Sequence, residues 1–394
     1  MKQIIILTLL IGMLSCTDAS NKSKNSEVEA TIDSVRATLP LYIGTYTKKE
    51  GHVDGKAAGI YLMEMNQENG HLTMKSVAAK VVNPSFVATS PEGKNLYAVS
   101  ELSPADDSTG YIYAFAINDS HELDLLHKLP TDGFAPCHIS FDKTGKFVFV
   151  CNYVGGVVKM YKRDDDGRLI PTDVLHLKGS TNHPRQESAH PHSTTVSPDN
   201  NFIFIADLGS NKIWSYNIDF ENGKLLPNTP VSIDLTEGAG PRHFTFDKSG
   251  KYAYVIDELD NRINAYSYDK NLGILTNLQS VSTLPENFEG DSYCADIHIH
   301  PNGKFLYGSN RGHDSIVAFR IGENGTLELI GHYPSKGIYP RNFSIDATGK
   351  YLYVANQNSD NIVQYNINQN SGVLTFSENI VAVKTPVCIT WSQN

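Results

Sequence analysis

The sequence predicts an all-β fold, a seven-bladed β-propeller with four antiparallel strands in each blade. Three observations support this prediction: a hairpin cassette occurs six times, a second hairpin pattern follows each copy, and the two chain ends together match one further copy. A period near 50 residues is typical of propellers and other repeat folds. The repeat is therefore interpreted before any single residue.

The cassette itself is the first hairpin of each repeat. Its copies read NPSFVATSPEGKNLYAV, APCHISFDKTGKFVFV, HPHSTTVSPDNNFIFI, GPRHFTFDKSGKYAYV, CADIHIHPNGKFLYGS and YPRNFSIDATGKYLYV. Their turn residues, 46 to 55 positions apart, are Gly93, Gly145, Asn200, Gly250, Gly303 and Gly349. Apolar and polar residues alternate on both sides of the turn, which predicts two antiparallel strands.

A second hairpin pattern follows each cassette. In DSIVAFRIGENGTLELIGHY, for example, two alternating runs flank an Asn-Gly pair, which is a strong hairpin signal. Each repeat is thus a four-stranded meander, and no helical periodicity of useful length occurs in the region 39–394. Four-stranded units repeated around an axis make a β-propeller.

The seventh blade is predicted from the chain ends. The C-terminal TPVCITWSQN matches the opening of a cassette, and PLYIGTYT near the start matches its later part. GIYLMEMNQENGHLTMKSV then supplies the second hairpin. Pairing of the N- and C-terminal strands would close the ring and remove an open sheet edge.

Residues 1–16, MKQIIILTLLIGMLSC, have the features of a signal peptide: one lysine, a short apolar run and then Cys16. The apolar run is too short to span a bilayer, so the mature chain is expected to have no transmembrane span. The cysteine resembles that of a bacterial lipoprotein signal, which predicts a lipid anchor at Cys16 and a location in the periplasm or at the outer membrane. Ordinary cleavage nearby is the alternative. Residues 17–38 are polar and predict a flexible tether before the propeller domain, 39–394.

Charge and cysteine content exclude several classes of function. The formal net charge of −10 argues against binding of nucleic acid. The other cysteines lack the spacing of zinc sites, so buried free thiols are expected at Cys137, Cys151, Cys294 and Cys388. No metal ion or cofactor is predicted.

Alignment of the cassettes locates a candidate site. The first strands begin at Ser85, Cys137, His192, Arg242, Ala295, Arg341 and Val387; the second strands end at Glu101, Tyr153, Leu208, Glu258, Arg311, Gln357 and Tyr46. The innermost strands of a propeller line its channel, so both sets should open on one face. Polar groups converging at a channel mouth indicate a small-molecule site.

Within these sets, four residues are the candidate catalytic group: His192, Arg242, Glu258 and Arg311. A single charged residue at a strand end is usually only solvated, but these four come from adjacent blades. Equivalent positions elsewhere hold Ala, Val, Cys and Leu, so the position itself does not require charge. Residues predicted to bind substrate around them are Arg341, Glu101, Tyr46, Tyr153, His138 and His243.

The motifs HPHSTTVSPDNNFIFIADLGSNKI, GPRHFTFDKSGKYAYVIDEL, ADIHIHPNGKFLYGSNRGHDSI and YPRNFSIDATGKYLYVANQNSDNIV carry a specific resemblance. From about Leu41 to Trp391 the chain resembles the bacterial lactonase family of seven-bladed propellers, typified by propeller-type 6-phosphogluconolactonases and including a fungal muconate-lactonising enzyme. The resemblance implies a carboxylic-ester hydrolase acting on a sugar lactone. It also implies an active-site His, Arg, Glu and Arg, which fall on the same four residues.

These residue types suit lactone hydrolysis, which needs a base for water, a group that stabilises the oxyanion and an acid for the leaving alkoxide. A histidine titrates near neutral pH, so His192 is the natural proton carrier. Glu258 between two arginines should have a lowered pKa. We expect His192 and Glu258 to do the acid–base work, while Arg242 and Arg311 bind and polarise the substrate.

Three alternatives remain open from the sequence. Oxygen ligands near strand ends (Glu101, Asn152, Asp207, Asn310 and Asn356) could hold calcium in a metal-dependent lactonase, although arginines at the same mouth would repel the ion. The chain could also be a binding propeller without activity, because one fold hosts many functions. A lactonising cycloisomerase is the third alternative. Export would favour a lactone outside the cytoplasm over an intermediate of the pentose phosphate route.

Overall fold

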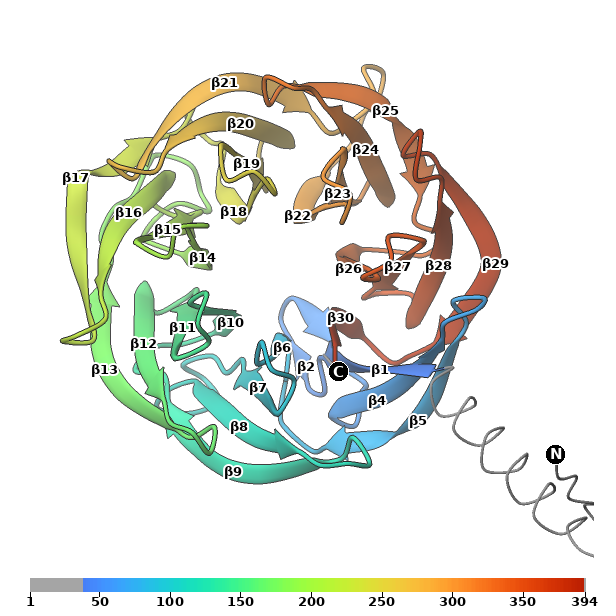
Figure 1. Cartoon of the computed structure of the whole chain (residues 1–394), viewed down its shortest axis with the longest axis horizontal. Coiled ribbons are helices and arrows are strands. Elements are labelled where there is room, and N and C mark those ends of the chain that lie inside the picture. Colours follow the sequence, from blue (N-terminus) through green and yellow to red (C-terminus); the bar gives the residue numbers. More distant parts are fainter. Residues whose placement is uncertain (1–37, 393–394) are drawn as a thin grey trace, which may run out of the picture.

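The computed structural model describes residues 38–392, in which all regular elements are β-strands. Seven four-stranded antiparallel sheets stand around a central channel like the blades of a propeller (Figure 1). The predicted seven-bladed β-propeller is therefore confirmed. A small separate hairpin, β2 (Lys49–Glu50) and β3 (Val53–Asp54), lies beside the channel in blue near β6 and β30.

Blades are numbered here by cassette, and their strands are given from the channel outwards. Blade 1 contains β6 (Val87–Thr89), β7 (Asn95–Ser100), β8 (Tyr111–Ile117) and β9 (Leu123–Pro130). Blade 2 contains β10 (Pro136–Phe141), β11 (Phe147–Asn152), β12 (Val157–Arg163) and β13 (Leu169–His176). Blade 3 contains β14 (Pro191–Val196), β15 (Phe202–Asp207), β16 (Lys212–Asp219) and β17 (Lys224–Asp234).

The next three blades follow the same order. Blade 4 contains β18 (Pro241–Phe246), β19 (Tyr252–Asp257), β20 (Arg262–Asp269) and β21 (Ile274–Ser282). Blade 5 contains β22 (Tyr293–Ile299), β23 (Phe305–Arg311), β24 (Ser315–Ile321) and β25 (Leu327–Pro334). Blade 6 contains β26 (Pro340–Ile345), β27 (Tyr351–Asn356), β28 (Asn361–Ile367) and β29 (Leu374–Ala382).

Blade 7 combines the two ends of the chain. Its order is β30 (Pro386–Trp391), β1 (Thr38–Thr45), β4 (Ile60–Asn66) and β5 (Leu72–Ala79). In the register of β1 with β30, Leu41 pairs with Trp391 and Ile43 with Ile389. The ring is thus closed by antiparallel pairing of the N- and C-terminal strands, as predicted, and Figure 1 shows them side by side.

The core consists of apolar layers between neighbouring blades. Because both faces of a blade are covered, the second strands are buried along almost their whole length, as in β15 and β23. One layer joins Tyr254 and Ile256 of blade 4 to Leu306 and Val317 of blade 5. Burial of each such side chain contributes about 1.5–3 kcal/mol. These layers hold the inner strands rigidly, and the inner strands carry the site.

A repeated tyrosine links most neighbouring blades. In five blades the hydroxyl on the second strand donates to a backbone carbonyl in the outer hairpin turn of the next blade, at 2.6–3.0 Å. These inter-blade tyrosines and their acceptors are Tyr42 (His121), Tyr97 (Gly167), Tyr254 (Gly325), Tyr307 (Gly372) and Tyr353 (Gly70). All the accepting residues have φ between 61° and 85°, the left-handed conformation of these turns. In blades 2 and 3, Phe149 and Phe204 stand in the second strand instead.

The remaining predictions concern thiols and the chain start. The four cysteines of the described range are buried and free, as expected. Within 38–392 there is no helix with the length and hydrophobicity that a bilayer span needs. The predicted signal peptide, Cys16 and nearly all of the predicted tether lie outside the described residues; Thr38 already belongs to β1.

Candidate functional site

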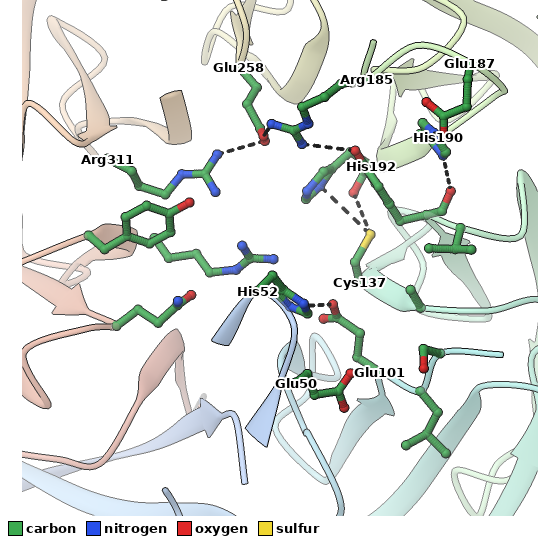
Figure 2. Close-up of a pocket in the computed structure, with 18 of the residues that line it drawn as sticks. Glu50, His52, Glu101, Cys137, Arg185, Glu187, His190, His192, Glu258 and Arg311 are labelled. Atoms are coloured by element: carbon green, nitrogen blue, oxygen red, sulfur yellow. Dashed lines mark hydrogen bonds and ion pairs between the residues drawn. The ribbon is translucent and has the colours of Figure 1, made fainter. Parts of the chain in front are cut away.

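A cavity of about 570 Å³ opens at one mouth of the channel. It is lined by residues of several blades and their loops (Figure 2): Glu50, His52, Glu101, Leu102, Ser103, Ala135, Cys137, Tyr153, Val154, Pro184, Arg185, Glu187, His190, His192, Glu258, Arg311, Tyr339, Arg341 and Gln357. Eight of the fourteen aligned strand-end residues therefore converge on it, whereas the predicted site residues Arg242 and Tyr46 are buried and are not among its lining residues. Its volume is that of a pocket for a small molecule.

Glu258 is the centre of a buried ion-pair cluster. Its side chain is only 4% exposed, and its Oε2 lies 3.0 Å from Arg242 Nε and 2.8 Å from Arg311 Nη2. A third guanidinium, of Arg185, reaches Oε1 at 2.7 Å; Figure 2 shows Arg185 and Arg311 approaching the carboxylate from two sides. Burial alone would raise the pKa of Glu258, but the positive charges of the three arginines outweigh it and hold that pKa well below its usual range. Glu258 is an anion at neutral pH.

Strand β22 fixes two of these arginines by an irregularity in its pairing. The register with β23 shifts between Cys294 and Ile297, which is the signature of a bulge. The carbonyls there accept from arginine: Cys294 O from Arg311 Nη2 at 2.8 Å, and Ala295 O from Arg242 Nη1. The guanidinium of Arg311 also lies 5.1 Å from the ring centroid of Tyr339. Both cations are therefore preorganised by backbone and aromatic contacts.

His192 lies in the same cavity and its Nε2 has no hydrogen bond to any described residue. Its Nδ1 is 3.9 Å from Cys137 Sγ, and the residue is 5% exposed. Burial lowers the pKa of His192 well below 6.5, and the charge of Arg242 lowers it further. The imidazole is therefore neutral at pH 7, whereas the sequence led us to expect titration in the neutral range.

His190, two residues earlier, is committed to structure. Its Nδ1 lies 2.8 Å from the carbonyl of Tyr153, and its Nε2 lies 3.0 Å from Glu187. The ring of Tyr153 stacks on His190 with centroids 4.6 Å apart and meets His192 edge-on at 5.5 Å. Of the two histidines, His192 thus presents the nitrogen that is open to a ligand.

The opposite side of the cavity holds a second polar group. The hydroxyl of Tyr46 lies 2.9 and 3.0 Å from the two carboxylate oxygens of Glu101. The guanidinium of Arg341 lies 5.6 Å from the Tyr46 ring centroid and makes no hydrogen bond or ion pair within the described range. Its donors are therefore available to a bound molecule. His52 Nε2 lies 4.0 Å from Glu101, and burial lowers the pKa of His52.

Arg185 is a site residue that the sequence analysis missed. It lies outside the cassettes, in the connection between β13 and β14, so alignment of the repeats could not reveal it. The buried side chain of Gln186 anchors this connection by donating to Leu208 O at 2.8 Å. Arg185 itself donates to the hydroxyl of Tyr153 at 3.1 Å. The signal available in the sequence was the 55-residue interval before Asn200, the longest between turns.

His138 and His243 do not line this cavity. They lie deeper in the channel and line a separate cavity of about 270 Å³ with Asp296 and His298. His243 Nδ1 lies 2.7 Å from Asp296 Oδ1, and His243 Nε2 lies 3.2 Å from Arg242 Nη1. His243 therefore touches the site through Arg242 instead of facing a substrate there.

Among the residues of the calcium alternative, the three asparagines use their amide nitrogens for structure, whereas the buried Oδ1 atoms of Asn152 and Asn356 accept no hydrogen bond from the described residues. Asn152, Asn310 and Asn356 each donate to a backbone carbonyl of the preceding inter-blade loop, at 3.3, 3.0 and 3.1 Å. Asp207 accepts from His190 N at 2.6 Å and from Trp214 Nε1 at 3.0 Å. Of this group only Glu101 lines the cavity. No cluster of three His, Cys, Asp or Glu side chains suited to a metal ion occurs in the part of the chain that the structure describes.

Comparison with known proteins identifies relatives along the whole propeller. The family model described as "Lactonase, 7-bladed beta-propeller" matches residues 40–391. A 6-phosphogluconolactonase of Bacillus subtilis is 35% identical over 351 residues, covering 88% of this chain and 97% of the relative. Another from Formosa agariphila is 36% identical over 319 residues, covering 78% and 86%. The solved structure of the periplasmic gluconolactonase of Pseudomonas aeruginosa has a TM-score of 0.84 at 28% identity, covering 90% of this chain and 99% of that one.

Proposed function

Because this chain belongs to the family of seven-bladed β-propeller lactonases, we propose that it is a lactone hydrolase that opens a sugar lactone to the free acid. The observation that carries this proposal is the Glu258 cluster beside neutral His192 in one cavity. Cations for an oxyanion and a base for water are the groups that ester hydrolysis needs. The relatives named as lactonases support the same reaction type.

In the mechanism that we propose, His192 is the general base. Its open Nε2 takes a proton from water as the water oxygen attacks the lactone carbonyl carbon. The ring C–O bond then breaks, and the imidazolium returns the proton to the departing alkoxide. Positive charge from Arg311 and the uncommitted Arg341 stabilises the oxyanion that forms in between.

Glu258 then has a different part from the acid–base role expected from the sequence. A carboxylate whose pKa is held well below its usual range has no proton to donate. Both oxygens of Glu258 are also paired with arginines, whereas Nε2 of the neutral His192 is open to water. We assign it to holding Arg242, Arg311 and Arg185 in place and to balancing the imidazolium that forms on His192. In this role the carboxylate offsets part of the positive charge of the three arginines.

Two substitutions test the assignment. His192→Ala and Glu258→Gln should each lower kcat/KM for an aldonolactone by on the order of a hundredfold or more, because each removes charge or proton transfer from the transition state. Acid release is followed in a pH-stat and corrected for spontaneous hydrolysis. His71→Ala, at an exposed turn, is the matched control. Wild-type rates in both site variants would refute these roles.

The same assay separates the alternatives. A chelator should leave hydrolysis unchanged; loss of activity that calcium restores would favour the metal-dependent enzyme. A cycloisomerase would form lactone from an unsaturated acid, and a binding propeller would do neither reaction. The comparison requires the purified propeller domain, with the aldonolactone as one substrate and the unsaturated acid as the other.

We also propose that the protein is exported and anchored by a lipid on Cys16. The sequence of residues 1–16 supports this, and so does the likeness to a periplasmic gluconolactonase. Expression in a bacterial host should give a membrane-bound protein whose mature chain begins at Cys16 and incorporates labelled palmitate. Cys16→Ala should abolish the labelling. A wild-type chain that retains residues 1–15 would contradict the proposal.

A further inference from the structure

We infer that this site is built for an uncharged, polyhydroxylated lactone, and that it disfavours the same lactone carrying a phosphate ester. The inference rests on the proposed lactonase function and adds the class of substrate. It comes from which charges in the cavity are already paired and which remain available to a ligand.

The positive charge of the cavity is largely committed. Arg242, Arg311 and Arg185 all pair with Glu258 within 3.0 Å. The first two also donate to carbonyls of β22, so they cannot turn towards a distant phosphate without losing buried hydrogen bonds. Arg341 is therefore the one cavity-lining arginine of the described range that has no hydrogen-bond or ion-pair partner, and its guanidinium contacts only the ring face of Tyr46.

The lysines of the neighbouring loops are also committed or face elsewhere. Lys48 pairs with Asp106, and Lys56 lies 3.5 Å from Asp54 and 3.6 Å from Asp360. Lys49 lines a separate hollow formed by the β2–β3 hairpin and Gln357–Asn358. None of the three lines the site cavity. The lysine-rich segment thus supplies no phosphate-binding group inside it.

The rest of the lining supplies carboxylates. Glu101 and Glu50 lie together on the side opposite Glu258, and Glu187 stands at the rim with a 65% exposed side chain (Figure 2). Near Glu101 the balancing cation is Arg341, since burial lowers the pKa of His52 and keeps it neutral at pH 7. A phosphate monoester carries a charge of about −1.5 to −2 at pH 7. Placed here, it would meet three carboxylates and one free guanidinium.

The same groups suit the hydroxyls of a sugar lactone. Carboxylate oxygens accept hydrogen bonds from hydroxyls, and these charge-assisted bonds are stronger than neutral ones. Arg341 has donors open for a carbonyl or hydroxyl oxygen. The Tyr46 hydroxyl holds Glu101 in a single orientation by contacting both of its oxygens. An uncharged polyol therefore finds paired donors and acceptors without bringing like charges together.

Steady-state kinetics with D-glucono-1,5-lactone and its 6-phosphate test the inference on the mature wild-type protein. We expect kcat/KM for the unphosphorylated lactone to be higher by on the order of tenfold or more, since like-charge contacts in a binding site are strongly unfavourable. If the protein hydrolyses neither lactone, the proposed function itself is refuted. Equal rates, or preference for the phosphate, would overturn this inference while leaving the lactonase function in place.

Two variants locate the discrimination. Glu101→Gln keeps the shape of the side chain and should raise kcat/KM for the phosphorylated lactone by several-fold. The selectivity ratio, kcat/KM for the unphosphorylated lactone divided by that for the phosphorylated one, should therefore decrease. Glu187→Gln at the exposed rim should lower the same selectivity ratio, and its amide oxygen can still accept a hydrogen bond from His190 Nε2. Glu64→Gln, which removes a carboxylate far from the cavity lining, is the control and should leave the ratio unchanged. An unchanged ratio in both cavity variants would contradict the inference.

Discussion

At the scale of single residues, His243 connects an arginine of the site to a buried carboxylate deeper in the channel. Its Nδ1–H donates to Asp296 Oδ1 at 2.7 Å, so its Nε2 is unprotonated and accepts from Arg242 Nη1 at 3.2 Å. Burial would raise the pKa of Asp296, but His298 and His243 outweigh it and hold the carboxyl ionised. Asp296 thus selects the tautomer of His243 that suits Arg242.

Asp296→Asn should disturb the site from a distance. Both oxygens of Asp296 accept hydrogen bonds, so an amide there must point its N–H at a group that also donates. When His243 relieves the conflict by changing tautomer, its Nε2–H points at Arg242 and displaces that guanidinium. We expect kcat to fall on the order of tenfold, because a buried donor or acceptor left unpaired costs about 1–3 kcal/mol.

The matched control for this prediction is His298→Asn. His298 also contacts Asp296, at 2.9 Å, but it has no contact with Arg242 in the described structure. It should keep kcat near the wild-type value. Equal loss of activity in both variants, with equal loss of thermal stability, would show a general structural effect and contradict the tautomer argument.

At the scale of strands and blades, the inter-blade tyrosines explain how similar blades keep one spacing. Each hydroxyl bonds to a turn of the next blade, so it ties an inner layer to an outer hairpin. The carbonyls that accept these bonds belong to turn residues in the left-handed conformation, mostly glycines. No hydrogen bond between strands satisfies these carbonyls. In the sequence these tyrosines look like ordinary aromatic core residues, but their hydroxyls link two neighbouring sheets.

Tyr254→Phe removes one such link and keeps the ring. The carbonyl of Gly325 then loses its partner, and we expect the free energy of unfolding to fall by about 1–2 kcal/mol. Tyr113→Phe is the control, because that hydroxyl has no hydrogen bond among residues 38–392. Denaturant midpoints measure the difference. Equal midpoints for the two variants would show that the link contributes nothing.

At the scale of the whole molecule, the ring encloses histidines that must stay neutral. Burial lowers the pKa of His192 well below 6.5 and that of His243 to about 4, with Arg242 adding to both effects. In the unfolded chain a histidine titrates near 6.5. Below that pH the unfolded state therefore binds protons that the folded state does not bind. The free energy of unfolding consequently decreases as the pH is lowered.

The expected result is a loss of unfolding free energy between pH 6.5 and 4. His243 alone accounts for on the order of 3 kcal/mol, from its pKa near 4 and about 1.4 kcal/mol per unit. The raised pKa of His298 acts oppositely, since its contribution is present below 6.5 and lost as pH rises through the folded value. Below about pH 4.3 protonation of Glu258 in the unfolded chain removes further stability.

Urea unfolding at steps from pH 7.5 to 4.5 measures this dependence. His192→Asn should make the unfolding free energy depend less steeply on pH below 6.5, because one histidine that stays neutral in the folded state has been removed. His71→Ala, at an exposed turn, should keep the wild-type slope. A wild-type stability that is constant or rises as the pH falls from 6.5 to 4.5 would contradict the prediction.

Much of the site could be predicted because the repeat gives each strand end a defined place. Equivalent positions in neighbouring cassettes predict that Arg242, Glu258 and Arg311 lie together, and the ion pairs agree with this prediction. The same logic failed for Arg185, which lies in a connection without an equivalent in other blades. It also failed to show that His243 lies outside the cavity. A shift of one position along a strand turns the side chain to the other face and places it at a different depth in the channel.

The sequence by itself determined the architecture of this protein: seven blades, the split blade at the termini and the mouth at which the aligned strand ends meet. Alternation of apolar and polar residues and the turn residues are local signals, and the same signals occur in each of the repeats. Only the tertiary structure decided the protonation states and the pairing of charges. Those depend on burial and on distances of about 3 Å between residues of different blades, which no local pattern encodes.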